Sequence, residues 1–247
     1  MSNELIGVIG GSILAILIFG CRRRPPVPRR LCGMQISPGS ADADAPVRDR
    51  FLRKAETQMK ILALDIGNVC LELHPELCLR QLGFADANAL PPELLALEAD
   101  QFECGRISPQ EFLAAARELL PSPLPPAAIE AAFRAIIGGP LPGMNELVDS
   151  LPQRGIRPVF FSDTSTIHLD EVRRRFPAAA VIPEGVYSFD CGARKKDDPM
   201  FERFEERFGV PFLYVDDNPA LIARARARGW RAEVFAGAAA LETALFG

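Results

Sequence analysis

The sequence predicts an α/β fold for residues 59–247: a Rossmann-like parallel sheet flanked by helices, with a small helical cap inserted after the first strand. Short apolar runs at 60–65, 157–163 and 211–217 have the length of buried strands, and each ends in polar residues. Helical patterns separate the later runs, and this alternation is typical of a parallel sheet covered on both faces. Residues 75–140 break the alternation and therefore form the insertion.

The remaining elements follow in order along the chain. The run RAEVF (231–235) predicts a weaker edge strand. Helices that cover the sheet are expected at 143–153, about 167–176, 198–208 and 218–228. Within the insertion, helices are expected at about 90–101, 108–119 and 126–137, with proline-rich joints. Ligands of such sheets bind at the carboxyl ends of the strands, so the insertion could lie over that crevice as a lid.

Composition argues against several classes of protein. The net charge of -4 over 247 residues does not suggest a nucleic-acid-binding protein, and we expect no nucleic-acid partner. The chain has six cysteines without CxxC spacing and only two histidines, which argues against a zinc site. A disulfide framework is not expected in a chain of this length.

The first 58 residues differ from the rest. Residues 5–20 form an apolar run, shorter than the roughly 20 residues that span a bilayer, and arginines follow it directly. Residues 22–58 have the composition of a disordered linker. Two hypotheses stay open: residues 5–20 are a weak membrane tether that keeps the rest of the chain on the cytoplasmic side, or translation starts at Met59. Either predicts a cytoplasmic location.

Polar side chains gather at the predicted strand ends. They are Asp65, then Ser162, Asp163 and Thr164, then Asp216, Asp217 and Asn218, together with the loop CGARKKDD (191–198). Several carboxylates at one crevice repel one another unless a cation joins them, and their oxygens suit Mg²⁺. A lysine can hold a phosphoryl group as a point charge, and an aspartate can be the nucleophile that forms an aspartyl-phosphate. The set predicts Mg²⁺-dependent phosphoryl transfer.

Four motifs in this order resemble the haloacid dehalogenase-like (HAD) hydrolase superfamily. They are LALDIGNV (62–69), VFFSDT (159–164), GARK (192–195) and YVDDN (214–218), and the resemblance covers nearly all of residues 59–247. The DIGNV form, together with CGARK, VDDN and the cap segment FECGRIS (102–108), is similar to the branch of α-D-glucose-1-phosphatase-like enzymes.

The resemblance implies a role for each matching residue. Asp65 would be the nucleophile and a Mg²⁺ ligand, and Lys195 would be catalytic. The further implied metal ligands are the backbone carbonyl of Gly67 and the side chains of Asp216 and Asp217. The implied phosphate-binding residues are Ser162, Asn68, Thr164 and Lys195.

The sequence departs from the family pattern at Gly67, where most phosphatases of the superfamily have an aspartate that acts as general acid and base. Such help is worth about 10²–10⁴-fold in rate. Three interpretations remain: another acid or a good leaving group, a different reaction, or a weakened enzyme. His74 and Asp163 are the candidate substitutes. A second departure is Lys196, where the branch commonly has proline, which makes Lys196 the alternative to Lys195.

These observations predict a Mg²⁺-dependent phosphomonoester hydrolase that acts on a small phosphometabolite, such as a sugar phosphate. The alternative is a weakly active or non-catalytic domain that binds a phosphorylated ligand. A metal-independent dehalogenase ranks last, because the pair Asp216 and Asp217 would be costly without a cation. Of the other polar residues, His168 is not expected to be catalytic, and Glu103 and Arg106 of the cap are expected at the surface.

Overall fold

The computed structural model describes residues 59–247. These residues contain a five-stranded sheet in the order β5-β4-β1-β6-β7, and all neighbouring strands are parallel. The strands are β1 (Lys60–Leu64), β4 (Ile156–Ser162), β5 (Gly185–Tyr187), β6 (Leu213–Asp216) and β7 (Ala232–Val234). The predicted α/β class with a parallel sheet is confirmed, and β7 lies at the expected edge.

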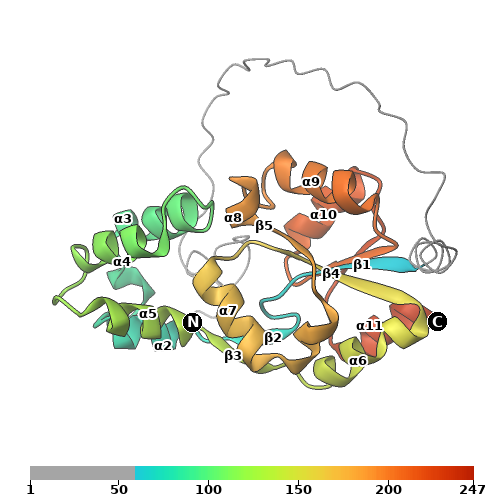
Figure 1. Ribbon diagram of the computed structural model, residues 1–247, viewed down its shortest axis with the longest axis horizontal. Helices are drawn as coiled ribbons and strands as arrows, with labels where there is room; N and C mark the ends of the chain where they lie inside the picture. The colour runs from blue at the N-terminus through green and yellow to red at the C-terminus, as the bar shows by residue number, and fades with distance from the viewer. Residues whose placement is uncertain (1–58) are drawn as a thin grey trace, which may run out of the picture. The chain divides into compact units, whose positions relative to one another are not determined.

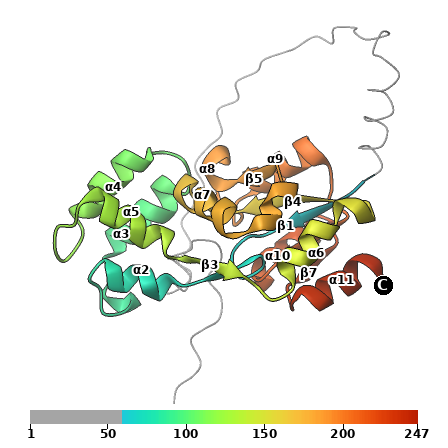
Figure 2. The ribbon, with the colours of Figure 1, turned by 60° about the horizontal axis from the view of Figure 1, so that its bottom comes forward.

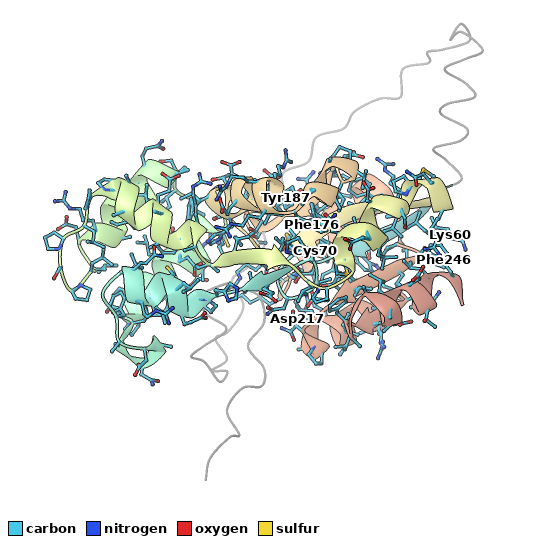
Figure 3. The ribbon with its side chains drawn as sticks, turned by 90° about the horizontal axis from the view of Figure 1, so that it is seen from below. Lys60, Cys70, Phe176, Tyr187, Asp217 and Phe246 are labelled. Atoms are coloured by element: carbon cyan, nitrogen blue, oxygen red, sulfur yellow. The ribbon has the colours of Figure 1, made fainter. Side chains whose placement is uncertain are left out.

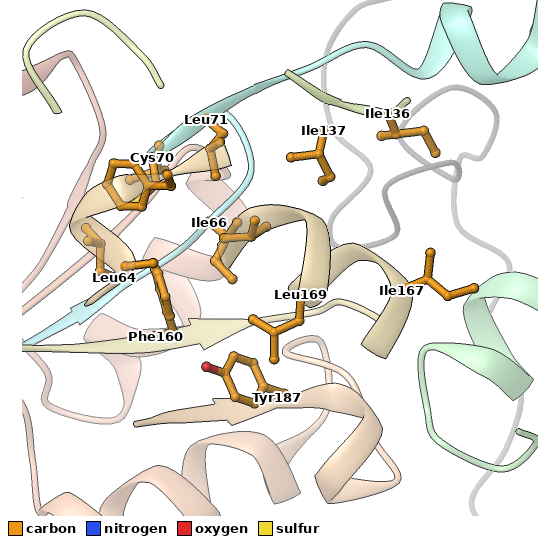
Figure 4. Packing of buried hydrophobic residues seen from close by; sticks show 14 of the residues in the cluster. Leu64, Ile66, Cys70, Leu71, Ile136, Ile137, Phe160, Ile167, Leu169 and Tyr187 are labelled. Carbon is orange, nitrogen blue, oxygen red and sulfur yellow. The ribbon is translucent and has the colours of Figure 1, made fainter. Parts of the chain in front are cut away.

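Helices cover both faces of this sheet (Figure 1). They are α6 (Met144–Ser150), α7 (Thr166–Arg175), α8 (Ser188–Cys191), α9 (Asp198–Phe208), α10 (Pro219–Ala227) and α11 (Ala238–Phe246), with short 3₁₀ turns η4 (Pro152–Arg154) and η5 (Pro177–Val181). Alternate residues of each strand point to opposite faces. Ala63 and Tyr214 therefore pack under α9 and α10, whereas Leu64 and Phe160 pack on the other face with Leu169 of α7 (Figure 4).

An aromatic cluster fills the space between the sheet and helices α9 and α10. Trp230 is 2% exposed, and its ring centroid lies 5.7 Å from those of Phe161 and Tyr214. Phe201 and Phe204 of α9 complete the cluster, at 5.0 and 5.2 Å from Trp230. Aromatic pairs at such separations stabilise beyond the area that they bury. The cluster therefore fixes the ring of Tyr214 below the carboxyl end of β6.

Removing the centre of this cluster tests its contribution. Trp230→Ala is expected to lower the free energy of unfolding by about 3–5 kcal/mol, because a large buried side chain leaves a cavity. Val210→Ala is the matched control, since Val210 is 60% exposed and little should change. Chemical denaturation of both variants measures the difference, and equal losses would contradict this account of the core.

A second group of helices lies between β2 (Leu71–Leu73) and β3 (Ile137–Pro140), which pair antiparallel. It contains α2 (Pro75–Gln81), η2 (Ala87–Ala89), α3 (Pro92–Ala96), the π-helical segment η3 (Leu97–Phe102), α4 (Pro109–Arg117) and α5 (Pro126–Arg134). Figure 2 shows α2–α5 grouped beside the sheet, with β3 leading back to it. We call residues 75–134 the cap helices; the division into domains stays a prediction.

Proline at the first turn explains where the cap helices begin. Helices α2, α3, α4 and α5 all start with proline, whose missing N–H would have no partner there. Ser108 and Glu111 add a capping box at α4. The expected helix over 126–137 is wrong at its end, because Ile137 pairs with Leu73 in the two-stranded ribbon.

Within residues 59–247, every helix is too short or too polar to cross a bilayer. The hypotheses on residues 1–58, a tether at 5–20 or a start at Met59, concern a segment outside the described residues.

Candidate active site

Asp65 stands at the carboxyl end of the central strand. Its backbone N–H donates to the carbonyl of Val215 at 3.1 Å, and the pairing of Leu64 with Val215 brings Asp65 level with Asp216. Figure 3 shows Asp217 on the side toward the cap helices, whereas Lys60 at the start of β1 lies at the opposite end. Two neighbouring parallel strands therefore present their carboxylates at one edge, as the sequence predicted.

Lys195 joins these carboxylates. The residue is 1% exposed, and its Nζ lies 2.8 Å from Asp65 Oδ1 and 2.5 Å from Asp216 Oδ2. The chain turns at Gly192, which adopts a left-handed φ of 66°, and the backbone N–H of Lys195 then donates to Asp163 Oδ1 at 2.8 Å. Lys196 is exposed, so Lys195 is the lysine that enters the site.

Asp216 and Asp217 have different surroundings. Asp216 accepts hydrogen bonds from Lys195 Nζ, from the hydroxyl of Tyr214 and from the backbone N–H of Asn218. A carboxylate offers about four acceptor positions, so Asp216 has little capacity left. Asp217 is exposed and accepts from Asn68 Nδ2 at 3.1 Å. Asp217 is therefore the more available of the two for a further ligand.

The carboxyl edge of the sheet offers donors of the kind that Mg²⁺ prefers. Asp65, Asp216 and Asp217 each offer one carboxylate oxygen, and these atoms lie within 4.8 Å of one another. An all-oxygen set of this charge fits Mg²⁺. Gly67 follows two residues after Asp65, and its role as a carbonyl ligand stays a prediction.

The pKa of Asp65 reflects its burial and the charged groups beside it. Burial raises its pKa to about 7; the charge on Lys195 opposes this shift, and the charges on Asp216 and Asp217 add to it. Burial also disfavours the charge on Lys195. The negative charges of Asp216, Asp65 and Asp163 outweigh this effect and raise the pKa of Lys195 far above its usual range. A cation beside Asp65 would favour the ionised carboxylate.

A pH dependence of stability follows for the metal-free protein. The unfolded carboxyl of Asp65 titrates near 3.8 and the folded one near 7, so the folded state holds the extra proton between these values. The free energy of unfolding therefore falls as pH rises through this window. Urea denaturation should show a smaller fall in Asp65→Asn than in the wild type, because burial also raises the pKa of Asp163 and of Asp217, which remain. Mg²⁺ should reduce the fall in the wild type. Equal pH slopes for the two proteins would contradict the assignment.

Two hydroxyl groups lie at the end of β4. Ser162 is buried, and its Oγ makes a long contact of 3.4 Å with the carbonyl of Asp163. Thr164 Oγ1 is buried and has no hydrogen-bond partner within residues 59–247. The backbone of Thr164 is held by Ser188: the Thr164 N–H donates to Ser188 Oγ at 2.9 Å, and the Ser188 hydroxyl donates to the Thr164 carbonyl at 3.0 Å. The two hydroxyls are therefore suited to donate to an anion.

Sequence reasoning did not assign Tyr214, Ser188 or Arg194 to the site. A signal existed for Tyr214, which stands two residues before Asp216 and therefore on the same side of the strand. The expectation of a surface position for Glu103 is wrong: its side chain is fully buried, and Oε2 lies 4.0 Å from Arg194 Nε. The cause is the docking of the cap segment on the loop before Lys195. Arg106 is exposed as expected, and it donates to the Gly192 carbonyl at 3.4 Å.

The two candidate substitutes for the missing acid have other partners. The ring nitrogens of His74 lie 3.4 Å from Glu72 and 3.5 Å from Glu76. Asp163 Oδ1 accepts from the Lys195 backbone, and its Oδ2 lies 3.6 Å from Arg194 Nε. The use of either residue as acid or base stays a hypothesis.

Comparison with known proteins finds similarity among solved structures. No protein-family model matches the sequence, and the search of curated proteins found no significant match. A predicted HAD-like family hydrolase from Porphyromonas gingivalis is 21% identical, with a TM-score of 0.65 over 77% of this chain and 99% of that one. A HAD family enzyme from Bacteroides thetaiotaomicron, in complex with magnesium and inorganic phosphate, is 22% identical, with a TM-score of 0.61 over 71% and 93%.

The molecule is thus an α/β protein with a cluster of three aspartates at the carboxyl edge of its sheet. Its fold is that of the HAD family enzymes, which confirms at the level of fold the resemblance that the four motifs predicted. The similarity to the glucose-1-phosphatase-like branch stays a prediction.

Proposed function

We propose that this chain is a HAD-like hydrolase that cleaves small phosphomonoesters with Mg²⁺ through an aspartyl-phosphate on Asp65. The observation that carries the proposal is the buried Lys195, which lies between Asp65 and Asp216 at the carboxyl edge of the sheet. A domain with only a structural role has no need of a buried cation between two carboxylates. The complex of the Bacteroides enzyme with magnesium and inorganic phosphate supports the same chemistry.

Each residue then has a defined task. Asp65 Oδ1 faces Lys195, so the second carboxylate oxygen of Asp65 is the one that attacks phosphorus. The new O–P bond forms as the bond from phosphorus to the leaving-group oxygen breaks. Lys195 balances the charge of the phosphoryl oxygens, and the hydroxyls of Ser162 and Thr164 donate to them. Asp65, Asp216 and Asp217 would hold Mg²⁺, which when bound would neutralise more of the phosphoryl charge. Water then attacks phosphorus, the bond between phosphorus and the Asp65 oxygen breaks, and inorganic phosphate leaves as the Asp65 carboxylate is restored.

The glycine at position 67 shapes the substrate preference. No side chain at Gly67 can protonate the leaving group, so esters whose leaving groups are stable as anions should react fastest. We place the natural substrate among small phosphometabolites, with sugar phosphates as the finer proposal from the branch resemblance. The alternative function, a domain that binds a phosphorylated ligand without cleaving it, rests on the same Gly67.

A screen of phosphomonoesters with the full chain tests the proposal. Turnover is expected with Mg²⁺ and should fall below detection in Asp65→Asn. Asp149→Asn is the matched control, because Asp149 is an exposed residue of α6 on one face of the sheet. Turnover that survives Asp65→Asn would contradict the nucleophile. Phosphate binding without turnover of any ester would favour the alternative, and metal-independent halide release would favour a dehalogenase.

A further inference from the structure

A second cluster of side chains that can bind a metal lies apart from Asp65, Asp216 and Asp217. Glu98, Glu103 and His168 are each fully buried, and each offers one ligand atom within 4.8 Å of the others. Glu98 belongs to η3 and Glu103 follows it directly, whereas His168 belongs to α7 of the sheet domain. The cluster therefore connects the cap helices with the sheet domain.

The π-helical turn brings the two glutamates together. The backbone N–H of Glu103 donates to the carbonyl of Glu98 at 2.8 Å, a bond that spans five residues. In a regular α-helix, residues five apart lie about 140° apart around the axis. The wider turn rotates the two side chains toward one side. Such turns are rare, and they occur frequently at functional sites.

His168 gives an independent indication of a ligand. Its side chain is fully buried, and neither ring nitrogen has a hydrogen-bond partner of normal geometry within residues 59–247. Burial lowers its pKa to about 4, although the backbone of Phe133 opposes this shift. The ring is therefore neutral at physiological pH, which is the form that binds a metal. A buried imidazole without normal hydrogen bonds, beside two carboxylates, needs a partner.

We propose that Glu98, Glu103 and His168 form a second divalent-cation site that ties the cap to the sheet domain. Imidazole and carboxylate ligands together suit transition metals such as Mn²⁺ or Fe²⁺. Arg194 lies 4.0 Å from Glu103, and its charge offsets part of the charge of both glutamates. Arg194 directly precedes Lys195. A cation here would hold the cap against the loop that carries the buried lysine.

Titration of the full chain with Mn²⁺ tests this site, with free Mn²⁺ counted by electron paramagnetic resonance. Mn²⁺ binds carboxylates and avoids the free thiols of Cys104 and Cys191. We expect two sites in the wild type, one in Asp217→Asn, one in Glu98→Gln and none in the double variant. Because Asp217→Asn removes only the crevice site, the result does not depend on whether the crevice is catalytic.

Matched variants keep the test decisive. Glu118→Gln changes an exposed cap glutamate and should retain both sites. Circular dichroism first shows that the variants are folded. Glu98→Gln and His168→Asn should then each lower the Mn²⁺ affinity of this site by more than about 10-fold, because loss of a residue that only contacts a metal ligand already lowers affinity by about that factor. Absence of a site in Asp217→Asn, or wild-type binding in Glu98→Gln and His168→Asn, would overturn the proposal. If neither variant folds, the absence of an anomalous peak beside His168 in Mn²⁺-soaked wild-type crystals would do so.

Discussion

Lys195→Met is expected to abolish turnover and to lower the free energy of unfolding by about 3–5 kcal/mol. Methionine keeps the length of the apolar stem but removes the charge that separates Asp65 from Asp216. Two buried carboxylates then face each other without compensation. Mg²⁺ should restore part of the lost stability, because a cation in the crevice supplies part of the missing positive charge, but it should not restore turnover.

The matched control is Lys196→Met, which changes the exposed neighbour of Lys195. Urea denaturation with and without Mg²⁺ measures stability, and steady-state kinetics on the best ester of the screen measure turnover. The account would be wrong if Lys195→Met were as stable and as active as Lys196→Met.

Gly67→Asp is expected to raise kcat for esters with poor leaving groups by about 10²–10⁴-fold, the usual contribution of a general acid. Esters with good leaving groups should gain much less, because their oxygens need no proton. The backbone at Gly67 does not adopt the left-handed conformation that disfavours side chains. An added Cβ would lie 2.6 Å from Leu73 Cδ1, the end of a flexible side chain that can move.

Gly67→Asn provides the control for this gain, because asparagine has the same shape and no acid. Leu73→Ala in combination with Gly67→Asp relieves the contact if crowding limits the effect. The ratio of kcat between poor and good leaving groups is the measurement. If Gly67→Asp and Gly67→Asn give the same ratio, another group already supplies the proton.

The long strands could be predicted because their apolar runs exceed what a loop would carry. β1, β4 and β6 are buried along most of their length and are bounded by polar residues. β5 has three residues and no distinct pattern, and β2 and β3 form a short irregular ribbon. Short strands of this kind depend on partners far away in the sequence, so a local pattern does not reveal them.

The crevice could be predicted because parallel strands place their carboxyl ends together. Asp65, Asp216 and the loop of Lys195 accordingly lie at one edge. The burial of Glu103 could not be predicted, since it depends on how the cap helices dock and on a π-helical turn.

The central claim is that Asp65 becomes phosphorylated during turnover, and acid-quenched mass spectrometry tests it most directly. Without an aspartate at position 67 to activate water, the aspartyl-phosphate should persist long enough to trap. The account predicts a phosphoryl group on Asp65, in the peptide that contains DIGNV, with Mg²⁺ and substrate present and none in Asp65→Asn. Phosphorylation of a different residue, or single-turnover hydrolysis without any covalent species, would contradict it.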